Sequence, residues 1–343
     1  MLIVAFALPL ALALLLTPLA IRLAWVVGWL DHPEARTLHT SAPAVLGGVV
    51  VFVAAVAGGA IALHGAPHSP GLEGGRGLFL LAGAVVSLAW GLWDDRFGMG
   101  VRPKLLGQLL AGACLLAAGV IPELGLPVWL EALLALFALV SLMNAVNFLD
   151  NMNGAVGGIA AVTLLASAGH AWMSGSAGLA AAELALAGAC VGFLPFNFPR
   201  ARIFLGDAGS LLLGYSLGAS VALAYAGTRS GWGRVGPLFG LVFPAFDLIF
   251  VVVTRIRDGR KVSQGGKDHS NHRLARVLSC PIRTVILVWC ITAALCASGF
   301  VVRSLNRPLP ALLVSGLWIL TLSWAGFRLS SVPSDVPSPS ERS

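Results

Sequence analysis

The stretch RIFLGDAGSLLLG, residues 202–214, places the carboxylate of Asp207 at the edge of a long apolar segment. The Leu- and Ala-rich run that follows continues to Ala226. Its length suits a helix that crosses the hydrocarbon core of a bilayer, which takes about 20 residues. An acid near membrane depth costs free energy and usually serves a function. The stretch therefore predicts a membrane-spanning helix with an acid at one end, and taken alone this acid is best explained as a cap of that helix.

Similar apolar windows recur along almost the whole chain. Of the 343 residues, 57% are hydrophobic and 11% are charged, which is typical of a polytopic helical membrane protein. The pattern predicts eleven spans, at residues 3–27, 44–63, 77–93, 105–121, 128–147, 155–174, 179–196, 208–226, 235–254, 283–302 and 309–327. We expect an all-α membrane protein with one domain at residues 1–328 and a disordered, Ser/Pro-rich tail at residues 329–343.

Lysine and arginine residues are distributed unequally between the two sides of this arrangement. Of the 22, seventeen lie in or beside the segments that follow the odd-numbered spans, and five lie on the other side. Because basic residues concentrate in cytoplasmic loops, the N-terminus is predicted to be outside and the C-terminus in the cytoplasm. The net charge of +7 is therefore mainly a topology signal. With no basic domain away from the bilayer, nucleic acid is not expected as a partner.

Acids, amides and histidines gather at four predicted cytoplasmic ends. The stretches are GLWDDRFGMGVRPKLLGQ from Gly91, NAVNFLDNMNGAVGG from Asn144, FNFPRARIFLGDAGS from Phe196 and GGKDHSNHRL from Gly265. Taken singly, each has an ordinary explanation: a solvated helix end, a hydrogen-bond seam between helices, a helix cap at Asp207, or solvated loop histidines. Their convergence on one membrane face predicts a functional site there.

In this order and at these intervals, the four stretches resemble the polyprenyl-phosphate N-acetylhexosamine-1-phosphate transferases. The resemblance runs from about Asp31 to Leu274 and includes RTLHTSAPAVLGG at residues 36–48. It implies transfer of a sugar-1-phosphate from a UDP-sugar to undecaprenyl phosphate, with release of UMP and Mg²⁺ (or Mn²⁺) as cofactor. It also implies a plasma-membrane protein whose active site is on the cytoplasmic face, and it leaves a homodimer open.

The resemblance further implies roles for individual residues. Asp207 would ligate the metal, and the free N–H groups at the start of its helix would favour an anion. Asp94 or Asp95 would deprotonate or orient the lipid phosphate. The remaining implied residues position or bind the substrates: Asn147 and Asp150 for the nucleotide or nucleophile, His269 and His272 for the pyrophosphate, and Lys104, Asn153, Asn197 and Arg273 for the substrates in general.

The chain departs from the family pattern in two places that bear on the donor. Asn153 stands where family members usually have an acid near the uridine, and His269-Ser-Asn-His272 replaces a run of histidines. The missing histidine triple favours a sugar-only donor over UDP-MurNAc-pentapeptide, the substrate of the nearest alternative. A secondary transporter is the alternative of another class, since Glu183 and Asp247 lie inside predicted spans, although transporters place their sites near the bilayer midplane.

Overall fold

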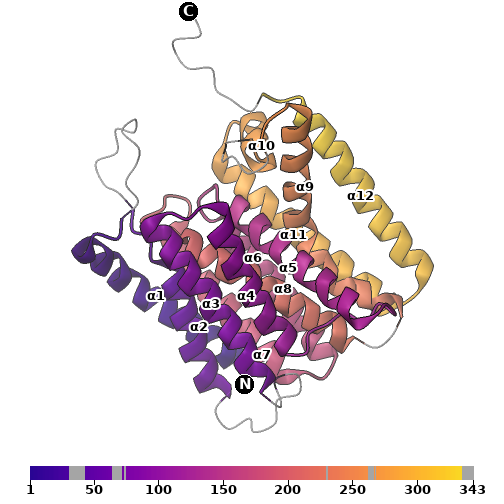
Figure 1. Ribbon diagram of the computed structural model, residues 1–343, viewed down its shortest axis with the longest axis horizontal. Helices are drawn as coiled ribbons and strands as arrows, with labels where there is room; N and C mark the ends of the chain where they lie inside the picture. Colours follow the sequence, from indigo (N-terminus) through magenta and orange to yellow (C-terminus); the bar gives the residue numbers. More distant parts are fainter. Residues whose placement is uncertain are drawn as a thin grey trace, which may run out of the picture.

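Twelve α-helices and one 3₁₀ helix make up the part of the protein that the structure, a computed structural model, describes: residues 1–30, 43–63, 72, 75–228, 231–261, 266 and 268–333 (Figure 1). In chain order they are α1 (Leu2–Val27), α2 (Gly47–Leu63), α3 (Arg76–Phe97), α4 (Val101–Ala117), α5 (Val128–Leu149), α6 (Ala155–Met173), α7 (Ala177–Asn197), α8 (Gly206–Gly227), η1 (Trp232–Leu241), α9 (Val242–Arg257), α10 (Ser270–Leu278), α11 (Pro281–Leu305) and α12 (Pro308–Ser330).

The all-α prediction is confirmed over this part of the chain. Nine helical segments there are long and apolar enough to cross a membrane, with η1 and α9 together forming one of them. The other two predicted spans correspond to α2 and α4, which have 17 residues each. Since these are shorter than a typical span, the count of eleven stays a prediction, as does the orientation of the termini. Residues 36–42 of the stretch at 36–48, and residues 334–343 of the tail, lie outside the described residues.

The helices differ from the expected spans at three places, each for a local reason. Helix α4 begins four residues earlier than its predicted span because Arg102 and Lys104 belong to its first turn, and it ends before Gly119, whose φ is 71°. The segment at 235–254 is divided into η1 and α9, with Pro237 inside the 3₁₀ part. Pro237 has no backbone N–H, so it cannot donate the hydrogen bond that the interior of an α-helix needs there. Helix α10 was not predicted, because the sequence there is too polar to read as a span.

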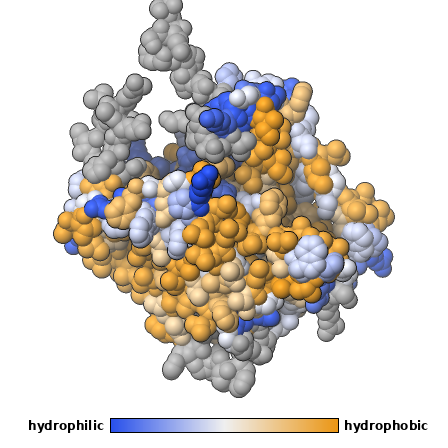
Figure 2. All heavy atoms as spheres, in the orientation of Figure 1, coloured by the Kyte–Doolittle hydropathy of each residue, from blue (hydrophilic) through white to orange (hydrophobic). Residues whose placement is uncertain are grey.

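Helices α6, α7 and α8 form the centre of the bundle. In the most apolar 18-residue stretch of each of these helices, between 67% and 78% is buried inside the protein. The corresponding share is 17% for α12 and 22% for α1. The exposed side chains on the outer helices are mainly Leu, Ile, Val, Trp and Phe. Figure 2 shows this apolar surface across the middle of the molecule, with polar residues gathered at the end that carries α10. This distribution fits a multi-pass membrane protein.

Small residues bring three helices together at the start of α8. A Cβ atom on Gly91 of α3 would overlap the Ala208 Cα, and one on Gly48 of α2 would overlap the Gly209 backbone nitrogen. The preceding chain is fixed as well, since the Gly47 N–H donates a 3.0 Å hydrogen bond to the Phe204 carbonyl oxygen. Such close packing through small residues is common between membrane helices. It places the last turn of α3 directly against the first turn of α8.

Candidate active site

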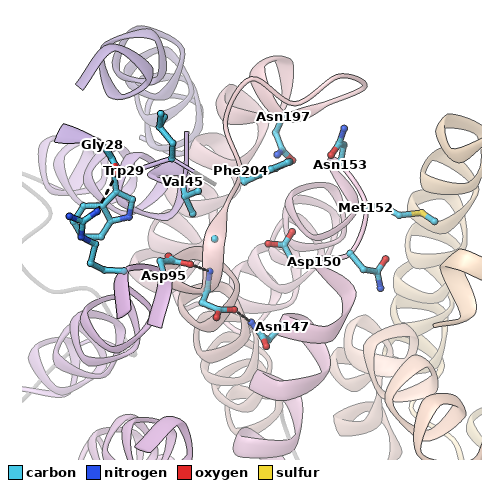
Figure 3. Close-up of a pocket in the computed structure, with 15 residues that line it drawn as sticks. Gly28, Trp29, Val45, Asp95, Asn147, Asp150, Met152, Asn153, Asn197 and Phe204 are labelled. Carbon is cyan, nitrogen blue, oxygen red and sulfur yellow. Dashed lines mark hydrogen bonds between the residues drawn. The ribbon is translucent and has the colours of Figure 1, made fainter. Parts of the chain in front are cut away.

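A cavity of about 680 Å³ opens where the ends of α1, α3 and α5 meet the start of α8. Its lining includes Asp95, Asn147, Asp150 and Asp207, and Figure 3 shows the first three around the beginning of α8. Three of the four stretches identified in the sequence therefore meet at one cavity. These stretches are far apart in the chain, and only the packing of α3, α5 and α8 brings them together.

Lys104 joins two of the predicted carboxylates. Its Nζ lies 2.8 Å from the Asp94 Oδ2 and 3.1 Å from the Asp207 Oδ2. The Asp94 Oδ1 accepts a further hydrogen bond of 2.6 Å from the Met99 N–H, which closes the turn between α3 and α4. The space between Asp94 and Asp207 therefore accommodates a positive charge, which α4 supplies in this structure.

Asp95 points away from Asp94 and caps α8. Its Oδ1 accepts a 2.7 Å hydrogen bond from the Asp207 N–H, and its Oδ2 accepts a 3.0 Å bond from the Ala208 N–H. A carboxylate at a helix N-terminus is favourable because it satisfies free donors and opposes the helix dipole. The expectation that these N–H groups would bind a phosphate is therefore wrong for the first two of them. Adjacent residues on a helix point about 100° apart, which is why Asp94 and Asp95 have different partners.

Asp207 does not cap its own helix. Its carboxylate accepts hydrogen bonds from Lys104 and from the Asn147 amide of α5. The same amide donates a 2.8 Å hydrogen bond to the Ser210 hydroxyl. One helical turn earlier, the Asn144 amide donates a 3.1 Å bond to the Gln108 side chain of α4. The seam interpretation is thus right for Asn144, whereas Asn147 reaches the site.

Asp150 follows the last residue of α5 and lines the cavity while remaining partly exposed. Among the described residues, no group donates a hydrogen bond to its carboxyl. Desolvation by the surrounding protein, together with the negative charges of Asp207 and Asp95, raises the pKa of Asp150 to about 7. This carboxyl can therefore change its protonation near neutral pH.

Asn153 and Asn197 line the cavity but make hydrogen bonds to the backbone. The buried Asn197 accepts a 2.8 Å bond from the Gly154 N–H and donates a 2.9 Å bond to the Ile203 carbonyl oxygen. Asn153 donates a 3.2 Å bond to the Pro199 carbonyl oxygen. Asn197 thus ties the turn after α5 to the segment that leads into α8. Asn153 leaves its carbonyl oxygen for other partners.

The two predicted histidines lie outside the cavity lining, at the start of α10. His269 is buried, and its ring packs edge-on against Phe148 of α5 at 5.7 Å between ring centres. Its Nδ1 lies 3.0 Å from the Oδ2 of Asp247, a fully buried residue of α9. The His272 ring lies 5.9 Å from that of His269. Phe148 follows the lining residue Asn147 directly, so His269 packs against the end of α5 that lines the cavity, and His272 lies beside His269.

Arg273 is placed differently from the expected substrate contact. Its guanidinium donates hydrogen bonds to the backbone carbonyl oxygens of Ser330 at 3.0 Å and Val332 at 2.6 Å, where it caps the end of α12. Just before α10, Asp268 forms a buried ion pair of 2.8 Å with Arg255. The hydrogen bond from Arg255, which outweighs the desolvation of the carboxyl, lowers the pKa of Asp268 to about 2. Both contacts fix the position of α10.

Sequence reasoning did not assign two cavity residues and one buried acid. Arg96 lines the cavity with its guanidinium 5.5 Å from the centre of the Trp29 ring, which also lines it. The sequence links Asp247 and Glu183 only to the transporter alternative, and in the structure Glu183 accepts a 2.8 Å hydrogen bond from Ser167. The position of Asp247 inside a predicted span is what marks it as significant in the sequence. Its contact with His269 is visible only in the fold.

A multi-pass helical membrane protein with acids and amides around one polar cavity, and a lysine paired with one of those acids, is the class that this fold and site define. Residues 78–225 match the family described as Glycosyl transferase family 4. The chain belongs to this family, in the branch of the polyprenyl-phosphate N-acetylglucosamine-1-phosphate transferases. The resemblance inferred from the four stretches is confirmed, and the transporter alternative is set aside.

Three relatives show how far the similarity extends. The decaprenyl-phosphate N-acetylglucosaminephosphotransferase of Mycobacterium tuberculosis (strain ATCC 25618 / H37Rv) is 32% identical over 299 residues, which cover 77% of this chain and 73% of the relative. The probable undecaprenyl-phosphate N-acetylglucosaminyl 1-phosphate transferase of Bacillus subtilis is 28% identical over 88% of this chain and 85% of the relative. The undecaprenyl-phosphate alpha-N-acetylglucosaminyl 1-phosphate transferase of Escherichia coli is 25% identical, with coverage of 89% and 85%.

Proposed function

We propose that the protein transfers N-acetylhexosamine-1-phosphate from a UDP-sugar to undecaprenyl phosphate, releasing UMP on the cytoplasmic face of the plasma membrane. The observation that carries the proposal is the cavity at the start of α8, where Asp95, Asn147, Asp150 and Asp207 converge. The names of the relatives support a polyprenyl-phosphate acceptor and an N-acetylglucosamine donor. They favour this donor over UDP-MurNAc-pentapeptide.

The residues of the cavity fit a divalent cation that also uses substrate oxygens. Among the described residues, no group of three acidic, histidine or cysteine side chains forms a complete metal site. Mg²⁺, however, often takes one or two protein carboxylates and completes its shell with phosphate oxygens and water. Asp207 would hold Mg²⁺ or Mn²⁺ at a place that already accommodates the Lys104 ammonium. The bound ion would neutralise charge on the phosphates.

The chain's own residues would position the reacting groups. Two anionic phosphates must approach each other, so catalysis depends on placement and charge neutralisation. Asp94 holds Lys104 in place, and Asn147 holds Asp207, which fixes the charged groups in the cavity. Asp150, free of hydrogen bonds from the described residues, would orient the acceptor phosphate or accept its proton.

An apolar cavity suits the isoprenoid chain of the acceptor. It has a volume of about 470 Å³ and follows α5 from Ala135 to Ala145, with α8 and α9 on its other sides. On α5 its lining ends at Ala145, close to Asn147 along the helix axis, whereas on α8 it lies between Gly218 and Tyr225, in the half of that helix away from Asp207.

Purified protein in lipid nanodiscs containing undecaprenyl phosphate would be tested with a panel of UDP-sugars and UDP-MurNAc-pentapeptide, each with and without Mg²⁺. We expect lipid-dependent UMP release with UDP-N-acetylglucosamine or a related N-acetylhexosamine donor, and little release after chelation of the metal. Release only with UDP-MurNAc-pentapeptide would establish the peptidoglycan alternative. UMP release that does not depend on the lipid would contradict the acceptor.

A further inference from the structure

Asp247 is a fully buried acid in the middle of α9 whose three contacts all lie at the start of α10. Its Oδ1 accepts hydrogen bonds from the Ser270 N–H at 2.9 Å and from the Ser270 hydroxyl. Its Oδ2 faces the His269 Nδ1 at 3.0 Å. An ionised carboxylate can only accept hydrogen bonds. With the carboxylate of Asp247 as acceptor, this contact is made by a His269 that carries its proton on Nδ1.

The other ring nitrogen of His269 has no hydrogen-bond partner within the described part of the chain. The ring is buried and supported on one side by Phe148 of α5, whose neighbour Asn147 holds Asp207. With Nδ1 occupied by Asp247 and the ring plane fixed by Phe148, only Nε2 remains for a ligand. A fixed tautomer and a fixed ring orientation are what a partner carboxylate gives to a histidine that contacts substrate.

We propose that Asp247 is a positioning residue that acts through His269. It holds the proton on Nδ1, so that Nε2 faces the phosphate groups of the donor. This inference rests on the proposed function, since it assigns the geometry of a histidine that would bind the pyrophosphate. The role of Asp247 is distinct from that of the cavity acids, because no lining residue of the cavity contacts it.

A purely structural role must be separated from this one, because Asp247 also caps α10 through the Ser270 N–H. The start of α10 is anchored independently by the Arg255–Asp268 ion pair at 2.8 Å. Ser270 offers a matched control: Ser270→Ala removes one hydrogen bond to Asp247 but leaves the contact with His269. If Asp247 only stabilised α10, Ser270→Ala and Asp247→Asn would have similar effects.

Asp247→Asn changes the contact with His269 itself. An amide can donate to Nδ1, which moves the ring proton to Nε2 and presents the wrong nitrogen state to a ligand, as is known for histidine–carboxylate pairs in hydrolases. Nitrogen NMR of protein labelled with ¹⁵N-histidine, assigned with His269→Ala, reports this directly. We expect an Nδ1-protonated His269 in the wild type and in Ser270→Ala, and loss of that state in Asp247→Asn.

Kinetics in nanodiscs complete the test. Asp247→Asn should lower the turnover number at least about tenfold, because the wrong nitrogen state of His269 then faces the donor phosphates, whereas Ser270→Ala should stay within about twofold of the wild type. In a His269→Ala background, Asp247→Asn should have little further effect, because the two residues act as a unit.

Full additivity of the two substitutions, or an unchanged His269 tautomer in Asp247→Asn, would overturn the proposal. Failure of the proposed function is a different result, in which the wild type itself releases no UMP with any sugar donor. The NMR measurement does not depend on that activity, so it still decides whether Asp247 fixes the His269 tautomer.

Discussion

Three carboxylates meet at the start of α8, and the structure gives each a different environment. Asp95 accepts two backbone N–H groups, Asp207 accepts only side-chain donors, and Asp150 accepts no hydrogen bond from the described residues. Substitution by asparagine, which removes charge at nearly constant shape, should therefore have a different consequence at each position.

Asp207→Asn should leave a folded protein with turnover reduced at least about a hundredfold, the scale of losing a key electrostatic group in an active site. The optimal Mg²⁺ concentration should rise, because a charged ligand is lost. The assay is lipid-dependent UMP release across a Mg²⁺ titration. An Asp207→Asn enzyme that works normally at ordinary Mg²⁺ would show that the carboxylate is not a metal ligand.

Asp95→Asn provides the contrast. An asparagine amide has one acceptor oxygen, so one of the two N–H groups at 207 and 208 loses its partner. We expect a loss of stability of about 1–2 kcal/mol, as for the removal of a helix cap, seen as a lower thermal unfolding temperature in detergent. Asp207→Asn should unfold close to the wild-type temperature, and equal destabilisation by both changes would contradict this division of roles.

Asp150 should make the reaction sensitive to pH. Because its pKa is raised from 3.8 to about 7, its carboxyl is protonated below pH 7 and ionised above it. If the ionised form acts on the acceptor, the rate should rise as the pH increases through about 7, and Asp150→Asn should remove that limb of the profile. The sign for stability is opposite: the stability linked to this raised pKa is present at low pH and is lost as the pH rises through 7.

At the scale of the elements, the site depends on how closely α3 approaches α8. A Cβ on Gly91 would overlap the Ala208 backbone, so Gly91→Ala must separate the two helices and move Asp95 away from the N–H groups that it caps. We expect a clear drop in unfolding temperature together with loss of activity. Overpacking of this kind typically costs about 1–3 kcal/mol.

Gly100→Ala is the matched control for Gly91→Ala. Gly100 precedes α4 with a φ of −72°, and a Cβ there would meet no atom within 4 Å. This variant should behave like the wild type in both unfolding temperature and UMP release. A Gly91→Ala protein that is as stable and active as Gly100→Ala would show that the α3–α8 contact does not hold the site together.

The predicted orientation concerns the molecule as a whole. Two exposed positions test it in a cysteine-free background: Ser304 near the end of α11, and Lys261 in the segment between α9 and α10. A membrane-impermeant thiol reagent added to intact cells should label Ser304→Cys and not Lys261→Cys, and it should label both after permeabilisation. The reverse pattern would place the cavity outside, where UDP-sugars are not expected.

The sequence by itself determined the all-α membrane class, the approximate spans and the set of chemically active stretches. Hydropathy and charge determine these features locally, because a bilayer tolerates only apolar helices with internally satisfied backbones. The particular residues and their order also carried the family resemblance, which the comparisons confirmed.

Only the tertiary structure decided which partner each polar group has. Asp95 caps α8, which begins more than a hundred residues later in the chain, and Arg273 caps the end of α12. Asp247 of α9 contacts His269, which directly precedes α10. These pairings depend on close approaches such as that of Gly91 to Ala208, which follow from the packing of helices distant in sequence. Local pattern identifies a polar residue as significant, but its chemistry is set by the neighbours that packing supplies.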